Sequence, residues 1–494
     1  MPRKLLLINP ANQLRKGFVN DPSTSFTPLG LGIVAALTPS DWDVELIDES
    51  FEDFVYKPAD LVALTGFTAN ATRAFEIAAV YRKAGIHTVM GGIHASMWTE
   101  EVAHLVDTVF TGEAEGAWPT LIRDFENGCI KDRYDGGIVE ISAIKSPRRE
   151  IFDKYPYVYD SIQTSRGCPI GCDFCSVTQM CGRTYRERPV EDVLDELEET
   201  RRPLLFIVDD NLMNNKKGAD QRAISLFKGM TERKIKKIWM GQAAVNFADN
   251  AEVLHWAKKS GCIMVFVGIE AENPNALKDV RKNLNLKRGV KSYHDVFRRM
   301  HRHGISILAF MIFGMESDKE EDLYARRDFI LSSSADSYQS AIMTPLPGTV
   351  LFERLKNQDR ITMNNYPDDW QQYDCHIATV NTPNLKAVQT EETMYKIWLS
   401  LYNKEAIRKK MFRTLWNTKS FTAAYWAYAS NHNYGRMFLE RFFDSDPNGL
   451  NKKLEWKNRK KSFYLRMTDI ALWMIYQTAW NRILKQISGN HGRK

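Results

Sequence analysis

Three of the seven cysteines stand close together, and their spacing is the feature of this sequence that most directly implies chemistry. Cys168, Cys172 and Cys175 follow the pattern C-x3-C-x2-C, a spacing expected by chance only about 0.001 times in a chain of this length and cysteine content. Thiolates spaced in this way can surround one cubane 4Fe-4S cluster. Because three thiolates bind three irons, the fourth iron is left open for another ligand. The motif therefore predicts a reactive iron-sulfur centre.

A zinc site is the alternative that the same residues leave open. Cys181 lies shortly beyond Cys175 and would supply the fourth ligand of a closed tetrahedral centre. We favour the cluster, because zinc knuckles usually pair two C-x2-C hooks, whereas this motif directly follows a short apolar run, on a loop of a β/α unit. Cys129, Cys262 and Cys375 are isolated and are more typical of small buried apolar residues than of ligands.

The cysteine motif opens a series of alternating strand and helix patterns. Apolar runs begin near residue 161 and recur at 204–208, 238–243, 264–268, 306–312 and 337–343. Helical patterns fall between them. Six such units predict a partial (β/α)6 barrel, in which functional residues belong at the carboxyl ends of the strands.

A separate series of the same kind occupies the first 125 residues. Apolar runs at 5–8, 44–47, 61–64, 88–90 and 108–110 alternate with helical patterns at 29–36, 71–84 and 116–125. We expect a doubly wound α/β domain with a five-strand parallel sheet and helices on both faces. Ligands of such sheets bind beyond the carboxyl ends of the strands.

These patterns divide the chain into three predicted domains: an α/β domain with its polar linker at 1–150, the partial barrel at 151–375, and a mostly helical region at 376–494. The last region is basic and aromatic. Residues 395–494 contain 20 Lys and Arg, six Asp and Glu, and 19 aromatic residues.

The charge of the C-terminal region suits two structures. A basic stretch at 452–461 precedes an aromatic stretch at 463–480, an arrangement that fits peripheral contact with an anionic membrane surface. Equally, the C-terminal region could form a helical cap over the barrel, with its basic face exposed to solvent. A nucleic-acid partner is not expected, because no base-stacking motif accompanies the charge and the rest of the chain is acidic.

Composition and cysteine usage place the protein among soluble, folded chains. Apolar residues make up 44% and charged residues 26%, which is ordinary for a globular protein. The seven cysteines are an odd number, and three of them are clustered. This usage suits a metal site in a reducing compartment more than a set of disulfides, so we expect a cytoplasmic location. No signal peptide is apparent, and the uncharged stretch 470–481 is too short to span a bilayer.

Residues 168–175 resemble the signature of the radical S-adenosylmethionine (SAM) superfamily. The match includes Phe174 immediately before the last cysteine, where family members contact the adenine of SAM. The resemblance implies that Cys168, Cys172 and Cys175 hold a 4Fe-4S cluster with SAM on its open iron. It also implies reductive cleavage of SAM to a 5′-deoxyadenosyl radical that abstracts a substrate hydrogen, with a reductant such as flavodoxin or ferredoxin.

The second and third barrel strands end in candidate SAM ligands. Asp209, Asp210 and Asn211 stand where the family's Gly-Gly-Glu binds the SAM amino group, and the departure from that motif leaves open which of them does so here. Gln242, at the end of the third strand, is either a hydrogen-bond partner of SAM or a structural amide.

The fourth and fifth strands carry further resemblances. Glu270, in Gly268-Ile269-Glu270, lies at the ribose-contacting end of the fourth strand, although Ala271 replaces a common serine. Gly314, within 312–316, matches the adenine motif of the fifth strand. The order of these segments along the chain is that of the family.

The first domain, placed before such a barrel, resembles the cobalamin-binding domain of cobalamin-dependent radical SAM enzymes. The segments 28–30, 91–94 and 112–119 carry this resemblance, which covers roughly residues 1–375. It implies that cobalamin binds beyond the strand ends and contacts three turns. The turn that would face the cobalt contains Gly66, Phe67, Thr68 and Asn70. The two later turns contribute Gly91, Gly92 and His94, and Gly112 and Glu113.

A histidine ligand to the cobalt is not expected. No complete Asp-x-His-x-x-Gly motif is present, and the nearest sequence, Asp374-Cys375-His376, has Thr379 where glycine is required. His94 is more typical of a structural histidine than of a ligand, with a contact to the nucleotide tail as the second option.

Both cofactors together imply a C-methyltransferase that acts on an unactivated carbon. Cobalamin would donate the methyl group to a substrate radical, and a second SAM would restore it. A hydrophobic or lipid-like small molecule as substrate would explain the basic aromatic C-terminal region. The alternative is a radical SAM cyclase, oxidase or carbon-carbon coupling enzyme whose first domain is a structural or docking unit without cobalamin.

Overall fold

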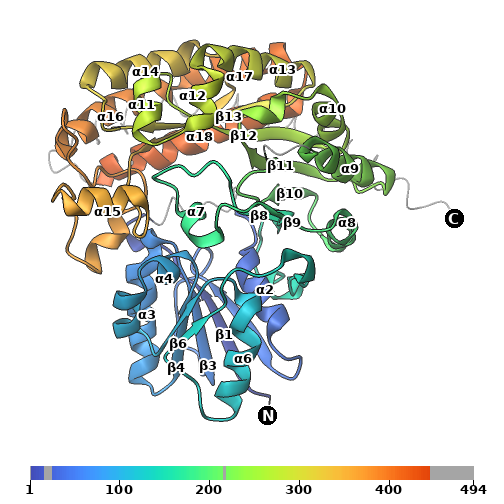
Figure 1. The fold of residues 1–494 in the computed structure, drawn as a ribbon, viewed down its shortest axis with the longest axis vertical. Helices are drawn as coiled ribbons and strands as arrows, with labels where there is room; N and C mark the ends of the chain where they lie inside the picture. The colour runs from blue at the N-terminus through green and yellow to red at the C-terminus, as the bar shows by residue number, and fades with distance from the viewer. Residues whose placement is uncertain (1, 16–24, 215–217, 445–494) are drawn as a thin grey trace, which may run out of the picture. The chain divides into compact units, whose positions relative to one another are not determined.

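A computed structural model describes residues 2–15, 25–214 and 218–444 (Figure 1). Up to Phe438 the chain forms one compact unit, which contains two parallel sheets and a set of C-terminal helices. The stretches 452–461 and 463–480, on which the predicted membrane contact depends, lie outside the described residues. The domain boundaries at 150 and 375 stay predictions.

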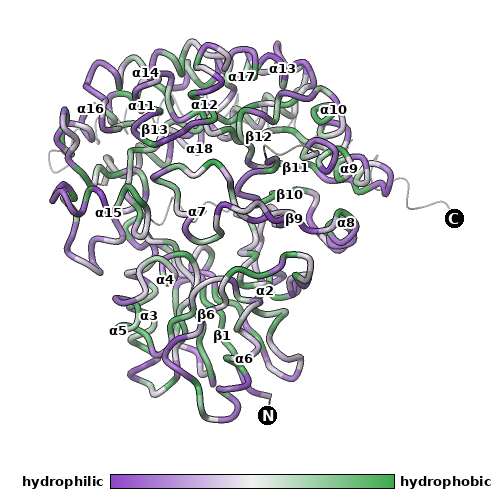
Figure 2. Tube along the Cα trace, in the orientation of Figure 1, coloured by the Kyte–Doolittle hydropathy of each residue, from purple (hydrophilic) through white to green (hydrophobic). Residues whose placement is uncertain are grey.

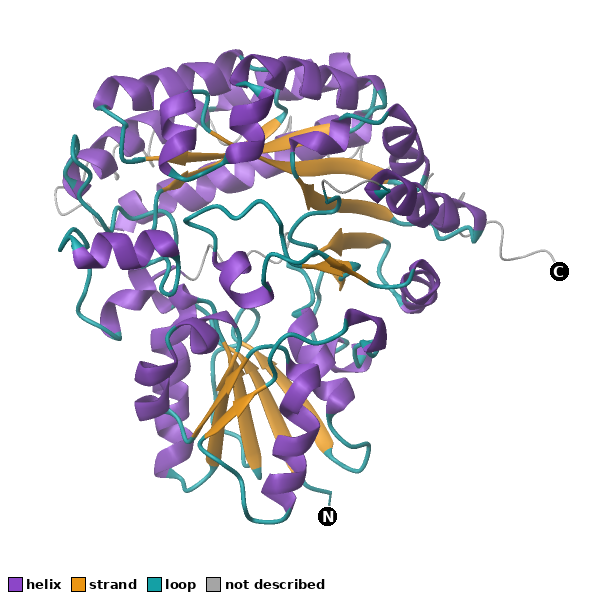
Figure 3. Ribbon diagram, in the orientation of Figure 1, coloured by secondary structure: helices purple, strands orange, loops and turns teal. Residues whose placement is uncertain are grey.

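The first sheet has six parallel strands in the order β2-β1-β3-β4-β5-β6 (Figure 3). Its strands are β1 Lys4–Asn9, β2 Asp43–Asp48, β3 Leu61–Thr65, β4 His87–Gly91, β5 Thr108–Thr111 and β6 Arg133–Asp135. Its helices are α2 Leu29–Leu37, α3 Ala71–Lys83, α4 Ile93–Met97, α5 Thr99–Leu105 and α6 Ala114–Glu126. The predicted doubly wound sheet is confirmed.

The expected count of five strands was wrong, because β6 pairs with β5 at the edge of the sheet. Only Tyr134 of this three-residue strand is buried, so the sequence offers no apolar run to mark it. The stretch 131–156 is also more than a linker, since Phe152 and Tyr155 pack into the core of the first sheet.

Strands β1, β3, β4 and β5 of the first sheet are buried on both faces, and Figure 2 shows the strands of this sheet as largely hydrophobic. Leu6 and Ile8 of β1 belong to a core with α3 and α5, whereas Leu5 and Leu7 belong to a second core with α2 and α6. Because successive strand residues point to opposite faces, burial of both faces requires a continuous apolar run. This is the pattern that made these strands recognisable.

The second sheet contains the six predicted barrel strands, all parallel, in the order β14-β13-β12-β11-β10-β7. Their bounds are β7 Tyr159–Ile162, β10 Leu204–Ile207, β11 Ile238–Ala243, β12 Cys262–Glu270, β13 Ser306–Phe313 and β14 Ser337–Ile342. A short antiparallel pair, β8 Ser165–Arg166 and β9 Arg186–Glu187, follows β7. The partial (β/α)6 barrel is confirmed.

The helices of the barrel follow or connect these strands. They are α7 Ser176–Cys181, α8 Val190–Glu199, α9 Ala219–Glu232, α10 Ala251–Lys259, α11 Pro274–Asp279, α12 Asn283–Arg288, α13 Tyr293–Arg302, α14 Glu320–Ser332 and α15 Val350–Asn357. One core cluster includes residues of both sheets, such as Val62 of β3 and Ile312 of β13. The first sheet and the barrel therefore share packed apolar side chains.

Three C-terminal helices follow the barrel: α16 Ala387–Leu401, α17 Lys404–Thr418 and α18 Phe421–Asp444. Helix α16 packs against α14 and α17 against α13. In α18, Trp426 Nε1 donates to Tyr159 Oη of β7 (3.2 Å), and Asn431 Nδ2 donates to the carbonyl of Asp336 beside β14 (2.9 Å). This helix thus contacts both edge strands. Among the described helices, none is long and apolar enough to cross a membrane.

Candidate active site

The three clustered cysteines lie on the loop that leads from β8 to α7, directly after the first barrel strand. Gly167 precedes them at φ 88°, and a Cβ there would stand 2.4 Å from the carbonyl oxygen of Thr184. The middle of the loop is tied to the barrel, because Asp173 N donates to Val280 O (3.2 Å) and Asp173 O accepts from Leu351 N (3.0 Å). Glycine and these backbone bonds fix the path of the loop.

A buried lysine acts on all three cysteine thiols. Burial raises the pKa of Cys172 to about 12 and that of Cys175 to about 11, while the nearby ammonium of Lys282 opposes the rise. The pKa of Cys168 is also raised by burial and lowered by Lys282. A metal centre that displaces the thiol protons, together with this cation, would hold the three sulfurs as thiolates.

The donor set fits a cubane cluster. Within the described residues, no group of three His, Cys, Asp or Glu side chains converges as a site for a single metal ion requires. A cubane does not need that convergence, since each of its three thiolates binds a different iron. Cys168, Cys172 and Cys175 are all free thiols.

Cys181 lies in a different electrostatic environment. It ends α7, and burial raises the pKa of its thiol to about 12. Asp210 and Glu113 also raise this pKa, whereas Arg166 and Arg186 lower it. Its carbonyl accepts a hydrogen bond from Arg186 Nη2 (3.3 Å). Lys282 lowers the pKa of each of the other three thiols but not that of Cys181, whereas Asp210 raises the pKa of Cys168 and Cys175 as it does that of Cys181.

The acidic pair after β10 divides into a satisfied and a partly open carboxylate. Asp209 is buried and accepts hydrogen bonds from Thr164 N (2.6 Å), Thr164 Oγ1 (2.5 Å) and Ser165 Oγ (2.6 Å). Asp210 accepts from Gly167 N (3.1 Å), and burial raises its pKa to about 6. The geometry gives Asp209 a positioning role, and its contact with SAM stays a prediction.

Asn211 and Gln242 lie beside this pair. Asn211 Oδ1 accepts from Ala244 N (3.0 Å), while its buried Nδ2 has no hydrogen-bond partner among the described residues. Gln242 is half-buried near the end of β11, and its carbonyl accepts from Leu212 N (2.8 Å). A buried amide donor left open at a strand end has the chemistry needed to bind a ligand.

Glu270 is paired with the lysine near the cluster loop. It lies at φ 64° at the end of β12, and its Oε1 accepts from Lys282 Nζ (2.7 Å). A Cβ at Gly268 would stand 2.5 Å from Glu270 Oε1 and 2.8 Å from Lys282 Nζ, so glycine makes room for the ion pair. Sequence reasoning missed Lys282, because it lies in a basic, polar segment and belongs to no motif.

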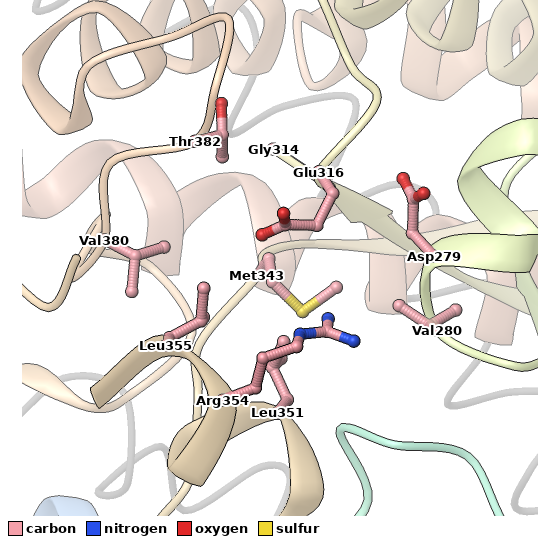
Figure 4. A pocket seen from close by; sticks show the side chains of 10 residues that line it. All are labelled: Asp279, Val280, Gly314, Glu316, Met343, Leu351, Arg354, Leu355, Val380 and Thr382. Atoms are coloured by element: carbon pink, nitrogen blue, oxygen red, sulfur yellow. The ribbon is translucent and has the colours of Figure 1, made fainter. Parts of the chain in front are cut away.

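A small pocket extends from Gly314 toward the cluster loop (Figure 4). Gly314 directly follows β13 with φ 77°, and its N donates to Asp318 Oδ2 (3.1 Å). Arg354 and Met343 line the pocket, and Arg354 Nη1 lies 3.7 Å from Asp173 Oδ2 on the cluster loop. Phe174 is half-buried and packs against the core cluster that includes Met343. The pocket lining thus contacts Asp173, which directly precedes Phe174.

The turn after β3 presents mainly backbone and one aromatic side chain. Gly66 is buried, whereas Phe67 is 71% exposed. Thr68 Oγ1 lies 3.3 Å from His94 Nδ1, and Asn70 Nδ2 donates to Pro10 O (2.9 Å). The polar side chains of this turn are therefore used within the protein.

The turn after β4 is also packed inside the molecule. Gly91 ends β4, and Gly92 follows at φ 92°, where a Cβ would stand 2.7 Å from Thr65 Oγ1. His94 is fully buried, and burial lowers its pKa to about 3. Its ring meets that of Trp370 edge to face, with 5.2 Å between centroids. This environment matches a neutral structural histidine.

The turn after β5 joins the first sheet to the cluster loop. Gly112 has φ 72°, and Glu113 follows it with a buried carboxylate. Glu113 pairs with Arg166 (2.9 Å) and with Arg186. Burial would raise the pKa of Glu113, but these two guanidinium groups lower it below its usual value. Arg166 lies in β8, two residues before Cys168, and Arg186 lies in β9. The ion pairs therefore connect the carboxyl end of β5 in the first sheet with the strand pair beside the cluster loop.

Residues 162–330 match the Radical SAM superfamily. The chain is 29% identical to bacteriochlorophyllide d C-12(1)-methyltransferase of Chlorobaculum tepidum over 83% of this chain and 89% of that protein. It is 25% identical to the hopanoid C-2 methylase of Rhodopseudomonas palustris over 69% of this chain and 67% of that protein. The structure of OxsB, a cobalamin-dependent SAM radical enzyme with aqua-cobalamin and SAM bound, has a TM-score of 0.64 at 16% identity, covering 93% of this chain and 75% of that one.

The cysteine loop, the barrel and the superfamily match define the protein as a radical SAM enzyme. The preceding α/β sheet makes the whole chain similar in fold to a cobalamin-dependent SAM radical enzyme, and the named relatives are methyltransferases.

Proposed function

We propose that this protein is a cobalamin-dependent radical SAM C-methyltransferase that acts on an unactivated carbon of a hydrophobic, lipid-like small molecule. The observation that carries the proposal is the ion-pair connection from Glu113, at the ligand-binding edge of the first sheet, to Arg166 near Cys168. It joins the expected cobalamin site to the expected cluster site. Relatives named as methyltransferases of a tetrapyrrole and of a hopanoid support the reaction and the substrate class.

The cluster and SAM would be held by the barrel loops. Cys168, Cys172 and Cys175 would bind the cluster, which supplies the electron that cleaves SAM. Asp210 would accept hydrogen bonds from the SAM amino group, because its carboxylate accepts a hydrogen bond from Gly167 N and has capacity for further donors. The open Nδ2 of Asn211 is a hydrogen-bond donor at the same strand end, suited to an acceptor group of SAM rather than to its amino group.

The adenosine would extend from these groups along the strand ends. Gln242 would contribute a hydrogen bond at the end of β11, and Glu270 would contact the ribose from β12. Phe174 and Gly314 would flank the adenine, because Gly314 lines a pocket with Met343 and Leu351, and Leu351 N donates to the carbonyl of Asp173, next to Phe174. Burial of this pocket would keep water away from the reacting carbon.

Cobalamin would lie beyond the strand ends of the first sheet and supply the methyl group. Gly66, Phe67, Gly92 and Gly112 would allow close approach of the backbone, and the exposed Phe67 ring would cover part of the corrin. The other predicted contacts, Thr68, Asn70, Gly91, His94 and Glu113, would shape the turns. Among the described turns that the resemblance assigns to cobalamin, the turn after β4 carries a histidine, His94. This side chain is buried against Trp370 and is not available as a ligand to the cobalt.

The reductant and the location complete the proposal. A flavodoxin or ferredoxin would deliver the electron, since the described chain contains no second cysteine cluster that fits an electron relay. The protein would work in the cytoplasm, with peripheral membrane contact as its route to a lipid-like substrate.

The experiment is product analysis with anaerobically reconstituted protein, hydroxocobalamin, reductant and SAM carrying a deuterated methyl group, offered tetrapyrrole and polycyclic lipid substrates. We expect a product heavier by one labelled methyl group, with 5′-deoxyadenosine and S-adenosylhomocysteine formed in equal amounts. The Cys168→Ala variant should form none of the three. A product without the label, formed equally well without cobalamin, would instead favour the cyclase, oxidase or coupling alternative.

A further inference from the structure

Helix α17 buries polar side chains and exposes apolar ones, the reverse of an ordinary surface helix. Its buried residues are Ile407, Lys410, Thr414 and Thr418. On the outside, Phe412 is 63% exposed and Trp416 is 76% exposed. Such large exposed apolar side chains mark an interaction surface when they are contiguous.

Polar contacts on the inner face fix this rotation of the helix. Lys410 Nζ donates to the carbonyls of Ile330 (2.8 Å), Ser333 (2.9 Å) and Ala335 (2.9 Å), at and beyond the C-terminal end of α14. Thr414 Oγ1 donates to Asp336 Oδ1 (2.7 Å). Because an ammonium at the C-terminal end of a helix is favourable, the apolar face of α17 is held outward by bonds on its opposite side.

The exposed face combines aromatic and cationic side chains. Its members recur at intervals of three and four residues, so they share one face, and all are exposed: Glu405, Arg408, Lys409, Phe412, Leu415, Trp416 and Lys419. Lys419 Nζ lies 4.1 Å from the centroid of the Trp416 ring. Three cations and one carboxylate therefore surround a contiguous apolar stripe.

We propose that this face of α17 binds the surface of a membrane containing anionic phospholipid. Trp and Phe favour the headgroup region of a bilayer, and Lys and Arg are attracted to its negative charge. A protein partner fits less well, because Lys is depleted at protein interfaces. The inference does not depend on the methyl-transfer reaction, and it concerns residues separate from the stretches 452–461 and 463–480.

Sedimentation with vesicles tests the proposal on the full chain. Vesicles of phosphatidylcholine alone and of phosphatidylcholine with phosphatidylglycerol are compared at low and high salt. We expect binding to the anionic vesicles that weakens as salt shortens the screening length. Phe412→Ser/Trp416→Ser should lower the partition coefficient at least about tenfold, and Arg408→Gln/Lys409→Gln about tenfold at low salt.

Matched variants separate this face from general surface properties. Lys83→Gln/Lys236→Gln removes two exposed charges elsewhere, and Val55→Ser/Tyr56→Ser removes two exposed apolar side chains from the first domain. Both should bind vesicles as the unchanged protein does. All variants should cleave SAM normally, because α17 lies outside the candidate active site.

Three results would overturn the proposal. The first is vesicle binding that does not depend on anionic lipid or persists in Phe412→Ser/Trp416→Ser. The second is an absence of vesicle binding with a dimer that this variant converts to a monomer, which would make a second copy the occupant. The third concerns the rate at which maleimide labels the new cysteine of Trp416→Cys, measured by peptide analysis. If this rate is no faster than that of the buried Cys262, other residues of the same chain cover the face.

Discussion

At the carboxyl ends of the barrel strands, side chains with unused bonding capacity gather around the cysteine loop. At the turns of the first sheet, most polar side chains named above are bonded within the protein, and His94 Nε2 is an exception. Asp210 accepts a hydrogen bond from Gly167 N, and Asn211 Nδ2 has no partner within the described residues. By contrast, Asn70 and Glu113 are engaged within the protein. The barrel edge is prepared for polar groups of a ligand.

This difference indicates two ways of holding a cofactor. In the proposed site, three cysteines and an open carboxylate would act through their functional groups, so each residue type would be required. At the first sheet, Gly92 and Gly112 adopt left-handed backbone conformations that a larger residue would strain. There the shape of the turns matters more than the identity of any polar side chain. Substitutions should therefore have larger effects at the barrel edge.

The largest effect is expected at the cluster loop. Replacing Cys168, Cys172 or Cys175 by Ala should abolish both the 4Fe-4S absorbance and reductive cleavage of SAM, because a thiolate ligand is lost. Cys181→Ala is the matched control and should retain both. Iron and sulfide analysis with assay of 5′-deoxyadenosine measures this. Loss of the cluster in Cys181→Ala, or its full retention in any of the other three, would contradict the assignment.

The next effect concerns the ion pair beside this loop. Lys282→Met leaves Glu270 buried without its partner, and we expect a loss of about 3–5 kcal/mol in the free energy of unfolding. The midpoint potential of the cluster should also become more negative, because a cation near its thiolates is removed. Chemical denaturation and potentiometric titration monitored by paramagnetic resonance measure the two changes.

Two further variants test the cause of the lost stability. Lys282→Met/Glu270→Met removes both charges and should recover most of it. Arg288→Met breaks a more exposed pair with Asp249 and should cost less than about 1 kcal/mol. If Lys282→Met is no worse than Arg288→Met, the pair does not have the importance assigned to it.

A smaller effect is expected at Asp210. The Asp210→Asn variant should keep the cluster but lose a charged hydrogen bond to SAM, worth about 1.5–3 kcal/mol, which corresponds to roughly 10- to 150-fold in SAM affinity. Equilibrium binding of SAM measures this, with the exposed Asp195→Asn as control. A normal affinity in Asp210→Asn together with a loss in Asn211→Ala would transfer the role to Asn211.

Most of the fold was predictable because its buried parallel strands are continuous apolar runs. Strand β12, for example, runs from Cys262 to Glu270 with buried residues on both faces. Strand β6 was missed because three mostly polar residues carry no periodic signal. The contact of α18 with both barrel edges could not be foreseen, because pairs such as Trp426 and Tyr159 are far apart in sequence.

The site was predictable where residue spacing itself encodes chemistry. The cysteine motif is local, so the sequence contains all the information needed to place it on a loop. Lys282 was missed, since its pairing with Glu270 depends on tertiary packing and on the space left by Gly268. Likewise, nothing in the sequence distinguishes the satisfied Asp209 from the more open Asp210.

The smallest effect is expected at the first sheet, where His94 tests whether any histidine binds the cobalt. We expect one cobalamin per chain after gel filtration, and a cobalt(II) paramagnetic resonance spectrum that is the same in the unchanged protein and in His94→Gln. The physical reason is that His94 is buried against Trp370, away from solvent. Labelling the protein with ¹⁵N-histidine provides a control that needs no substitution, because a directly bound imidazole would change the nitrogen hyperfine splitting. Labelled and unlabelled proteins should give identical spectra. A change on labelling would show a histidine ligand, and the contrast drawn between a side-chain site and a backbone site would then fail at the first sheet.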